Sequence, residues 1–398
     1  MDAGKTGSKW QWSSHDIQAA RVVVGCWLTL FPAAGLLNSS GTLQAILLEG
    51  DLRSYTDSEV SWIISVYAWA YFFGGLLITG SIGVILASLS MSFCRAYYQY
   101  MLAFGVLGGF SSSCLYTTCV AVLAHWYDKR RALATALALT AGSIGGIAYP
   151  FMLSGLTPKI GLDWTFRATT LLTVVCLCLG IVLVRARLPP NSQARCIFDW
   201  RGFKDMRFTV TMLAFFFLEG AVLIPPAYIT MYAISMGVER SMVDKLLPIM
   251  NATAVLGRVI PGLAADIFGR YNVTILCIVT CSALIPGLWL QADRNAASMA
   301  VFAGLYGFFS GPAYSLTPVC VSQLCRVEEY ASKYGAAYGI VSLATLSGIP
   351  FSGLVLEARG ERNYEHLILF CGATYVVASI LFIVARALCC GWRFRTIF

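Results

Sequence analysis

The sequence predicts an all-α membrane protein with twelve transmembrane helices in two six-helix halves. Of its 398 residues, 58% are hydrophobic and 12% are charged, and the mean hydropathy is +0.71. The apolar residues come in blocks of about 18–25, the length that crosses roughly 30 Å of hydrocarbon. The basic residues behind the net charge of +8 stand at the ends of these blocks, where membrane orientation and anionic lipid explain them without nucleic acid.

The first half is predicted to span residues 21–184, after a polar cytoplasmic tail at residues 1–20. Its first span covers about Val22–Leu48 and carries a polar patch at Asn38, Ser39 and Ser40, which must face protein or water. Spans four to six follow at about Tyr97–Ala124, Ala132–Leu153 and Phe166–Val184, with TPKIGLDW as the loop before span six.

Spans two and three are unusual because no charged residue occurs in the 35 positions from Val60 to Cys94. That length is too long for one span and barely enough for two. We predict two helices, at about Val60–Leu77 and Ile78–Phe93, with almost no connector. A tight turn would use the glycines of this run, which are Gly74, Gly75, Gly80 and Gly83. One long tilted helix is the alternative.

A basic cytoplasmic loop at residues 185–207 is predicted to divide the chain, with Pro189 and Pro190 as helix breakers. The second half, residues 208–388, repeats the layout, and residues 389–398 form a cytoplasmic tail. Its expected spans are about Phe208–Ser235, Leu246–Ala265, Val273–Leu290, Ala297–Cys325, Tyr334–Leu356 and His366–Leu388.

The turn HWYDKRR before span five fixes the predicted orientation. Lys129, Arg130 and Arg131 lead directly into the charge-free segment ALATALALTAGSIGGIAYP, and a basic loop against an apolar helix marks the cytoplasmic side. The predicted cytoplasmic segments together hold about 18 Lys and Arg residues and the outer ones about 9. Both termini are therefore expected in the cytoplasm.

The sequence lacks the motifs of several functional classes. The 14 cysteines lie mostly inside apolar blocks and show no metal-ligand spacing, so we expect packing roles and no metal. The sequence has no Walker A motif, no zincin motif and no nucleophile elbow. We therefore expect neither an enzyme nor an ATP-driven pump, and no cofactor.

Two ionisable residues lie deep in predicted spans, where an unpaired charge is costly and function is the default hypothesis. Arg258 in span eight would bind substrate or form a structural ion pair. Glu219 in span seven would carry a coupled proton or serve as the fixed partner of Arg258, because the two lie at similar depth in neighbouring spans. Both alternatives stay open for each residue.

A polar cavity lining is expected from Asn38 together with tyrosines of several spans. Tyr228 and Tyr314 are the tyrosines that we select as candidate substrate contacts, although packing is an alternative role for each. Glycines at small-residue spacing, such as Gly142 and Gly146, are expected to serve close helix contact.

The exit of span eight reads GRVIPGLAADIFGRYN, residues 257–272. It resembles the loop motif G-x-(L/A)-x-D-x-x-G-R of the major facilitator superfamily, with Gly262, Asp266, Gly269 and Arg270 at the matching positions. Asp266 is suited to cap or charge-pair at a helix end, and Arg270 supplies a positive partner. The resemblance implies a major facilitator fold in which this cluster, with Lys129, Arg130 and Arg131, gates the two halves.

The chain resembles more finely the fungal branch of the monocarboxylate porter family. The resemblance covers nearly the whole chain, in order, through GLLNSSGTLQ, DSEVSWIISVYAWAYFFGG, AYYQYMLAFGVLGGFSSSC, HWYDKRRALATALALTAGSIGGIAYP, DWTFR, RARLPP and PPAYITMYA. It implies that Arg258 engages a substrate carboxylate, which suits its bidentate geometry.

Three departures from that family pattern matter. The facilitator motif between spans two and three is absent, because GGLLITGSIGV runs straight through. Either the gene model lacks a segment or this member lacks the N-terminal latch. Animal lactate carriers have Lys where this chain has Asn38, and Asp where it has Ala254. We therefore do not expect simple proton–lactate symport.

The expected function is secondary active transport of a small organic solute, an organic anion or a secondary metabolite, with efflux favoured. Uptake of a monocarboxylate or vitamin-like solute is the alternative, and a non-transporting membrane sensor is the alternative of another class. We expect a plasma-membrane monomer in contact with lipid, protons as the coupling ion, and no nucleic-acid partner.

Overall fold

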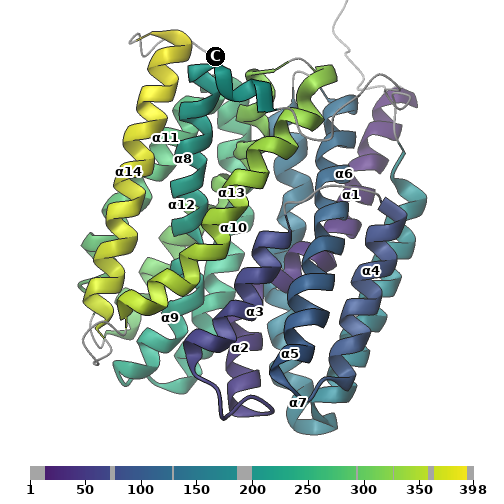
Figure 1. Ribbon diagram of the computed structural model, residues 1–398, viewed down its shortest axis with the longest axis vertical. Helices are drawn as coiled ribbons and strands as arrows, with labels where there is room; N and C mark the ends of the chain where they lie inside the picture. Colours follow the sequence, from purple (N-terminus) through teal and green to yellow (C-terminus); the bar gives the residue numbers. More distant parts are fainter. Residues whose placement is uncertain are drawn as a thin grey trace, which may run out of the picture.

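The computed structural model describes residues 14–71, 77–127, 130–185, 200–292, 295–325, 327–356 and 363–391, and the chain is predominantly helical throughout these ranges (Figure 1). The elements before the central connector are α1 (Ser14–Asn38), α2 (Ser40–Glu49), α3 (Asp57–Ala70), α4 (Leu77–Ser90), η1 (Met91–Phe93), α5 (Tyr97–Tyr100), η2 (Met101–Gly108), α6 (Gly109–Trp126) and α7 (Arg131–Leu183).

The elements after the connector are η3 (Trp200–Lys204), α8 (Met206–Val222), α9 (Ile224–Ser235), α10 (Arg240–Phe268), α11 (Arg270–Leu284), η4 (Ile285–Trp289), α12 (Ala296–Gln323), α13 (Val327–Leu356) and α14 (Tyr364–Cys390). Residues 186–199, most of the predicted cytoplasmic loop, lie outside the described residues.

Within the described residues, nine continuous helical stretches are long and apolar enough to cross a membrane. One of them, α7, contains predicted spans five and six, and α3 and α4 account for spans two and three. Helices therefore occupy the described parts of all twelve predicted spans. The start of α1 and the end of α14 lie at the same end of the molecule, which is the upper end in Figure 1.

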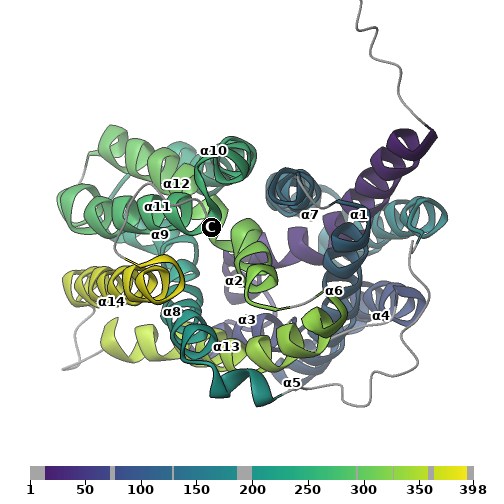
Figure 2. The same cartoon turned by 90° about the horizontal axis from the view of Figure 1, so that it is seen from above.

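The helices form two groups that correspond to the two halves of the sequence. Viewed from above, α1, α4, α6 and α7 lie on one side and α9, α11, α12 and α14 on the other (Figure 2). Within the halves, α1 packs along α7 and α14 packs along α8. The halves meet mainly where α10 packs on α7 and where α13 packs on α3.

Side-chain caps begin several helices at the lower end of Figure 1. Thr56 and Glu59 form a capping box at the start of α3, in which each side chain accepts a hydrogen bond from the other residue's backbone N–H. Asn295 and Asn363 likewise accept backbone N–H bonds at the starts of α12 and α14.

The predicted loop TPKIGLDW before span six is wrong in detail. Helical structure continues through these residues, and α7 changes direction at Gly161, whose φ of 80° lies in the left-handed region that favours glycine. A turn around one glycine therefore replaces an extended connector. Helices also extend into the predicted tails, since α1 begins at Ser14 and α14 continues to Cys390.

Spans two and three are separate helices, but both are short. α3 and α4 have 14 residues each, about 21 Å at 1.5 Å per residue, against roughly 30 Å of hydrocarbon. Both stop well below the upper end that α6 reaches (Figure 1). Residues 72–76, with Gly74 and Gly75 of the predicted turn, lie outside the described residues.

Gly80 and Gly83 do not form the predicted turn, because both are inside α4. A Cβ at Gly80 would approach the Cβ of Cys114 to 2.7 Å, and one at Gly83 would approach the hydroxyl of Ser111 to 2.0 Å. These glycines let α4 pack directly against α6.

Candidate functional site

A small cavity of about 50 Å³ lies between the two halves. Its lining comes from α1 and α2 on one side and from α8, α9, α10, α12 and α13 on the other. The residues are Leu37, Asn38, Ser40, Val222, Leu223, Pro226, Ala227, Met250, Asn251, Ala254, Arg258, Tyr306, Ser310, Gly311, Tyr314 and Ile349. Polar groups thus face an otherwise apolar chamber, as in many sites for small organic ligands.

The first span of each half has a local irregularity where it passes this cavity. It lies at Ser39, between α1 and α2, and at Leu223, between α8 and α9, while the helical path continues through both positions. Irregular helix positions that correspond in two halves often lie near the substrate site of transporters. Here Asn38, Ser40 and Leu223, next to or at these irregularities, line the cavity.

Prolines at the second irregularity free two main-chain carbonyls. Pro225 and Pro226 lack the N–H groups that would bond to the carbonyls of Ala221 and Val222. The hydroxyl of Tyr306 donates to the Val222 carbonyl at 3.0 Å, and Sγ of Cys371 lies 3.8 Å from the Ala221 carbonyl. Side chains from distant helices therefore stabilise the irregular backbone.

Arg258 is buried on α10 at the cavity wall. Its Nη1 donates to the main-chain carbonyl of Leu139 on α7, in the other half of the chain. Its guanidinium carbon lies 5.5 Å from the ring centre of Tyr314, a cation–π distance. The buried Nε has no hydrogen-bond partner among the described residues. The guanidinium is thus held in place, and the hydrogen of its buried Nε is unused in this structure.

Glu219 on α8 is buried, with 1% of its surface exposed, but it does not line the cavity. Its Oε2 has no hydrogen-bond partner in the part of the chain that the structure describes. It lies close enough to Tyr116, Tyr314 and Tyr338 to act on each electrostatically. No ion pair joins it to Arg258 among the described residues, so the structure does not bring this predicted pair together.

Two of the three other predicted substrate contacts line the cavity. Asn38 and Tyr314 line the cavity with Arg258. Tyr228 does not, and its hydroxyl donates at 3.1 Å to the carbonyl of Ile349 on α13. In this structure the Tyr228 hydroxyl thus joins α9 to α13 at a residue whose side chain lines the cavity, so a substrate contact of Tyr228 stays a prediction.

The span-eight motif lies at the upper end of the interface between the halves. Asp266 accepts a 3.2 Å hydrogen bond from the backbone N–H of Leu133, in the first turn of α7. A carboxylate there is favoured by the unpaired N–H groups and the helix dipole. Gly262 allows the close approach, since a Cβ there would lie 2.8 Å from the Cβ of Ala136. Gly269 ends α10 with a φ of 94°.

The basic members of the predicted gate are less engaged with Asp266. Arg270 begins α11 and forms no ion pair with Asp266 among the described residues, so the α7 N-terminus is the partner that the structure shows for this carboxylate. Arg131 is buried and Arg130 is exposed at the start of α7. Lys129 lies outside the described residues.

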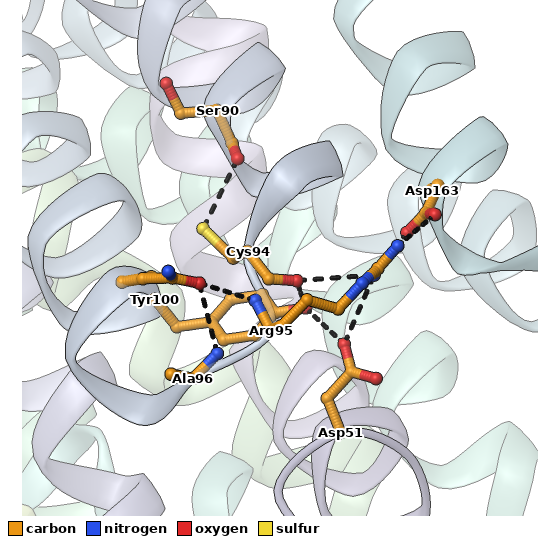
Figure 3. Close-up of polar contacts among 8 residues, drawn as sticks. Asp51, Ser90, Cys94, Arg95, Ala96, Tyr100 and Asp163 are labelled. Carbon is orange, nitrogen blue, oxygen red and sulfur yellow. Dashed lines mark hydrogen bonds and ion pairs between the residues drawn. The ribbon is translucent and has the colours of Figure 1, made fainter.

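A cluster at the lower end was not predicted. Arg95, between η1 and α5, lies between Asp163 and Asp51 (Figure 3). Its guanidinium makes two hydrogen bonds to Asp163, one at 2.7 Å, and lies 3.7 Å from Asp51. These hydrogen bonds raise the pKa of Arg95 well above its usual value. Tyr100 donates to Asp51 at 2.8 Å, so the cluster ties three segments of the first half together.

A second lower-end contact joins the two halves. Arg240 at the start of α10 lies 3.1 Å from Glu49 at the end of α2, and both side chains are exposed. Arg240 also lies 3.5 Å from Asp244 within its own helix. The cavity is therefore bounded by polar contacts between the halves at both ends, Glu49–Arg240 below and Asp266–Leu133 above.

Comparison with known families decides what this architecture is. A family model described as the Major Facilitator Superfamily matches residues 25–290. The chain belongs to this superfamily. It is an integral, multi-pass membrane protein and a transporter of a small organic solute.

Curated relatives of this facilitator are fungal transporters. It is 32% identical over 409 residues to the riboflavin transporter MCH5 of Saccharomyces cerevisiae, covering 94% of this chain and 78% of the relative. It is 29% identical over 381 residues to the aspyridones efflux protein apdF of Emericella nidulans, covering 92% and 77%.

Solved structures share the fold of this facilitator. The human organic anion transporter MFSD10 aligns with a TM-score of 0.69 at 13% identity, covering 93% of this chain and 100% of that one. The nucleoside transporter NupG aligns with a TM-score of 0.68 at 14% identity, covering 92% and 99%. At these identities the likeness concerns the fold alone.

Sequence reasoning missed Asn251 and Ser310, two polar residues of the facilitator's cavity. The spacing in span eight contains a signal for the first. Asn251, Ala254 and Arg258 recur at intervals of three and four, which places them on one face of α10. A polar residue one or two turns from a buried arginine, on the same face, is a candidate for the same cavity.

Proposed function

We propose that this facilitator is a monocarboxylate porter of the fungal branch that moves an organic anion or an acidic secondary metabolite, coupled to protons, in the direction of efflux. Arg258 carries the proposal. It is the one cationic side chain among the described residues that line the cavity. A guanidinium in this position is suited to bind a carboxylate.

The contact of Arg258 with the Leu139 carbonyl supports a role in the transport cycle. The contact crosses from one half to the other, so it holds the halves together when no substrate is bound. A carboxylate can accept two parallel hydrogen bonds from a guanidinium, whereas the Leu139 carbonyl accepts one. A substrate carboxylate therefore competes with Leu139 for the guanidinium, and binding loosens the contact between the halves.

Glu219 is the proposed proton carrier. A carboxylate sealed from water without a partner is costly, so a proton on this group relieves the cost when the site is closed. Its place beside Tyr314, whose ring also contacts Arg258, lets the charge of Glu219 respond to events at the cavity. Proton uptake and anion binding are then coupled through neighbouring groups.

Asn38 and Ala254 support a substrate other than lactate. Both stand where animal lactate carriers are expected to have charged residues, and both line the cavity. An amide and a methyl group leave a wider and less charged chamber than a lysine and an aspartate. This chamber suits an amphipathic anion, with its apolar part against residues such as Val222 and Ile349.

The polar contacts at the two ends of the interface are the proposed gates. We assign the upper gate to Gly262, Asp266, Gly269 and Arg270, acting on the α7 N-terminus that follows Lys129, Arg130 and Arg131. We further propose a monomer in the plasma membrane, in contact with lipid, with both termini in the cytoplasm. The basic segments at the upper end support this orientation.

Proton-gradient-driven flux in proteoliposomes tests the proposal. Wild type, Arg258→Ala and Glu219→Gln are compared over a panel of aromatic and aliphatic carboxylates. Arg21→Ala is the basic-residue control, because Arg21 is exposed and lies outside the cavity lining and the proposed gates. We expect gradient-driven anion flux in wild type, loss of flux in Arg258→Ala, and flux without gradient dependence in Glu219→Gln. Folded, monodisperse wild type that moves no member of the panel would refute carboxylate transport.

Uptake of a vitamin-like solute is the second candidate, because the riboflavin transporter MCH5 is 32% identical to this chain. The direction of transport distinguishes uptake of a vitamin-like solute from efflux of an organic anion. Cells that express the facilitator and accumulate riboflavin or a carboxylate against its gradient favour uptake, whereas reduced retention of a preloaded carboxylate favours efflux. Uptake at equal rates in Arg258→Ala cells would show that the solute does not use the proposed anion site.

A further inference from the structure

Asn251 contacts the main chain of α7 at the place where a proline interrupts that helix. Pro150 lies within α7 and has no N–H, so the carbonyl of Gly146 lacks its usual partner four residues later. Nδ2 of Asn251 donates to this carbonyl at 3.2 Å and to the carbonyl of Leu247 at 3.2 Å. A side chain from the second half thus satisfies a carbonyl of the first half.

Gly146 is required for this approach. A Cβ there would lie 2.9 Å from Cγ and Nδ2 of Asn251 and 2.7 Å from the Cβ of Asn38. The glycine therefore leaves room for two amide side chains beside the α7 backbone. Gly142, on the same face of α7, leaves room for Arg258 in the same way. A Cβ at Gly142 would lie 3.4 Å from Nη1 of Arg258.

These bonds fix which end of the Asn251 amide faces the cavity. Both acceptors are carbonyl oxygens, so the NH₂ group must point at them, and both of its hydrogens are used. Oδ1 accepts no hydrogen bond from any residue within the described ranges. Oδ1 is not among the fully buried side-chain atoms that lack a hydrogen-bond partner, so part of its surface is exposed to open space. Since Asn251 lines the cavity, its oxygen is the group available there.

We propose that Asn251 is a specificity-determining residue that accepts a hydrogen bond from a hydroxyl or N–H group of the substrate. The inference rests on the proposed function and narrows its substrate class. Arg258 and Asn251 are seven residues apart on one face of α10, about 10 Å along the helix. The preferred solute is therefore an anion with a carboxylate at one end, an apolar middle and a hydrogen-bond donor at the other end.

A matched pair of ligands tests this role. Binding of 3-(4-hydroxyphenyl)propanoate and of 3-phenylpropanoate to the purified full-length chain is measured by isothermal titration calorimetry. The two differ by one hydroxyl. We expect wild type to bind the hydroxylated anion about 3- to 10-fold more tightly, the range for one neutral hydrogen bond. In Asn251→Ala this ratio falls to about one.

The ratio separates a substrate contact from a structural role. Loss of packing at Asn251 would weaken both ligands equally and leave their ratio unchanged, and that result would overturn the proposal. Gly146→Ala, which displaces Asn251 without removing its oxygen, is expected to reduce the ratio as well. Thr253→Ala is the control, because Thr253 bonds only to carbonyls of its own helix, at Ile249 and Met250, within the described residues.

Failure of this inference and failure of the proposed function are distinguishable. Equal binding of the two ligands by wild type, or binding of neither, would overturn the subsite whatever the flux measurements show. Selective binding that depends on Asn251, in a protein that moves neither anion across a vesicle membrane, would support the subsite and overturn transport of these carboxylates.

Discussion

Gly145 sets the distance between α1 and α7, the most extensive contact within the first half. A Cβ at this position would lie 2.6 Å from Cα of Gly35 and 2.7 Å from the carbonyl oxygen of Phe31. Both neighbours are backbone atoms, which cannot move aside as a flexible side chain can. Sequence spacing predicted glycine-mediated contact here, and the structure names the opposing helix.

Gly145→Ala is expected to destabilise the protein by about 1–3 kcal/mol, because overpacking at a helix crossing forces backbone shifts. Gly155→Ala is the matched control, since Gly155 lies in the same helix with nothing within 4 Å of an added Cβ. The control is expected to be neutral or stabilising by up to about 1 kcal/mol, from helix propensity. Thermal unfolding in detergent measures both, and equal midpoints would contradict the assigned contact.

Arg258→Lys tests whether guanidinium geometry, rather than positive charge, is needed. Lysine supplies a point charge and no planar fork, so it cannot hold the Leu139 carbonyl and a carboxylate together as arginine can. We expect the apparent KM for the transported anion to rise about 10-fold. Arg21→Lys, at an exposed position outside the proposed gates, serves as the control. An unchanged KM in Arg258→Lys would show that charge alone suffices.

At the scale of elements, the sequence predicted where the spans lie better than where helices within them end. Apolar block length identified α10, α12 and α14 because hydrocarbon thickness imposes it. The charge-free run from Val60 to Cys94 indicated two helices, but not that both stop short of the upper end. The division of span one at Ser39 could not be predicted, because it depends on packing against another part of the fold.

The candidate site was predictable to the extent that burial of charge is costly. Arg258 and Glu219 stood out because ionisable side chains are rare in apolar spans. The Leu139 partner of Arg258 did not, because a main-chain carbonyl on another helix leaves no mark in a sequence. Tyr314 was predicted as a substrate contact, but its ring contact with Arg258 was not.

The prolines inside helices were a signal that the sequence analysis did not use. Each one frees a main-chain carbonyl, and distant side chains satisfy two of these, Tyr306 at Val222 and Asn251 at Gly146.

Tyr306→Phe is expected to disturb the junction of α8 and α9. It removes the donor to the Val222 carbonyl, which Pro226 leaves without a helical partner, and it costs about 1–3 kcal/mol as a buried unsatisfied group. Tyr375→Phe is the control. It removes only the 2.8 Å contact between the two tyrosine hydroxyls and leaves the Tyr306–Val222 bond intact. Equal losses of thermal stability in the two variants would argue against the carbonyl as the important partner.

At the scale of the whole molecule, α10 is the element that both gates share. It begins with Arg240 at the lower gate and carries Asp266 at the upper gate, with Asn251 and Arg258 between them. All four side chains contact the first half. Movement of α10 against α7 therefore changes the cavity and both gates together, as alternating access between rigid halves requires.

The lower gate is expected to be weak and sensitive to salt. The Glu49 and Arg240 side chains are 66% and 61% exposed, and exposed ion pairs typically contribute no more than about 1 kcal/mol. Glu49→Gln should therefore increase opening at the lower end by up to about 5-fold at low ionic strength. The difference from wild type should shrink in high salt, because counterions screen the pair.

Asp244→Asn separates gating from local helix stability, because Asp244 pairs with Arg240 only within α10. Opening is measured in a cysteine-depleted background as the reactivity of Ala227→Cys, in the cavity wall, toward a polar thiol reagent added at the lower side. Glu49→Gln should speed labelling while Asp244→Asn leaves it near the wild-type rate. Equal acceleration in both variants, or acceleration that persists in high salt, would show that the pair across the two halves does not hold the cavity closed.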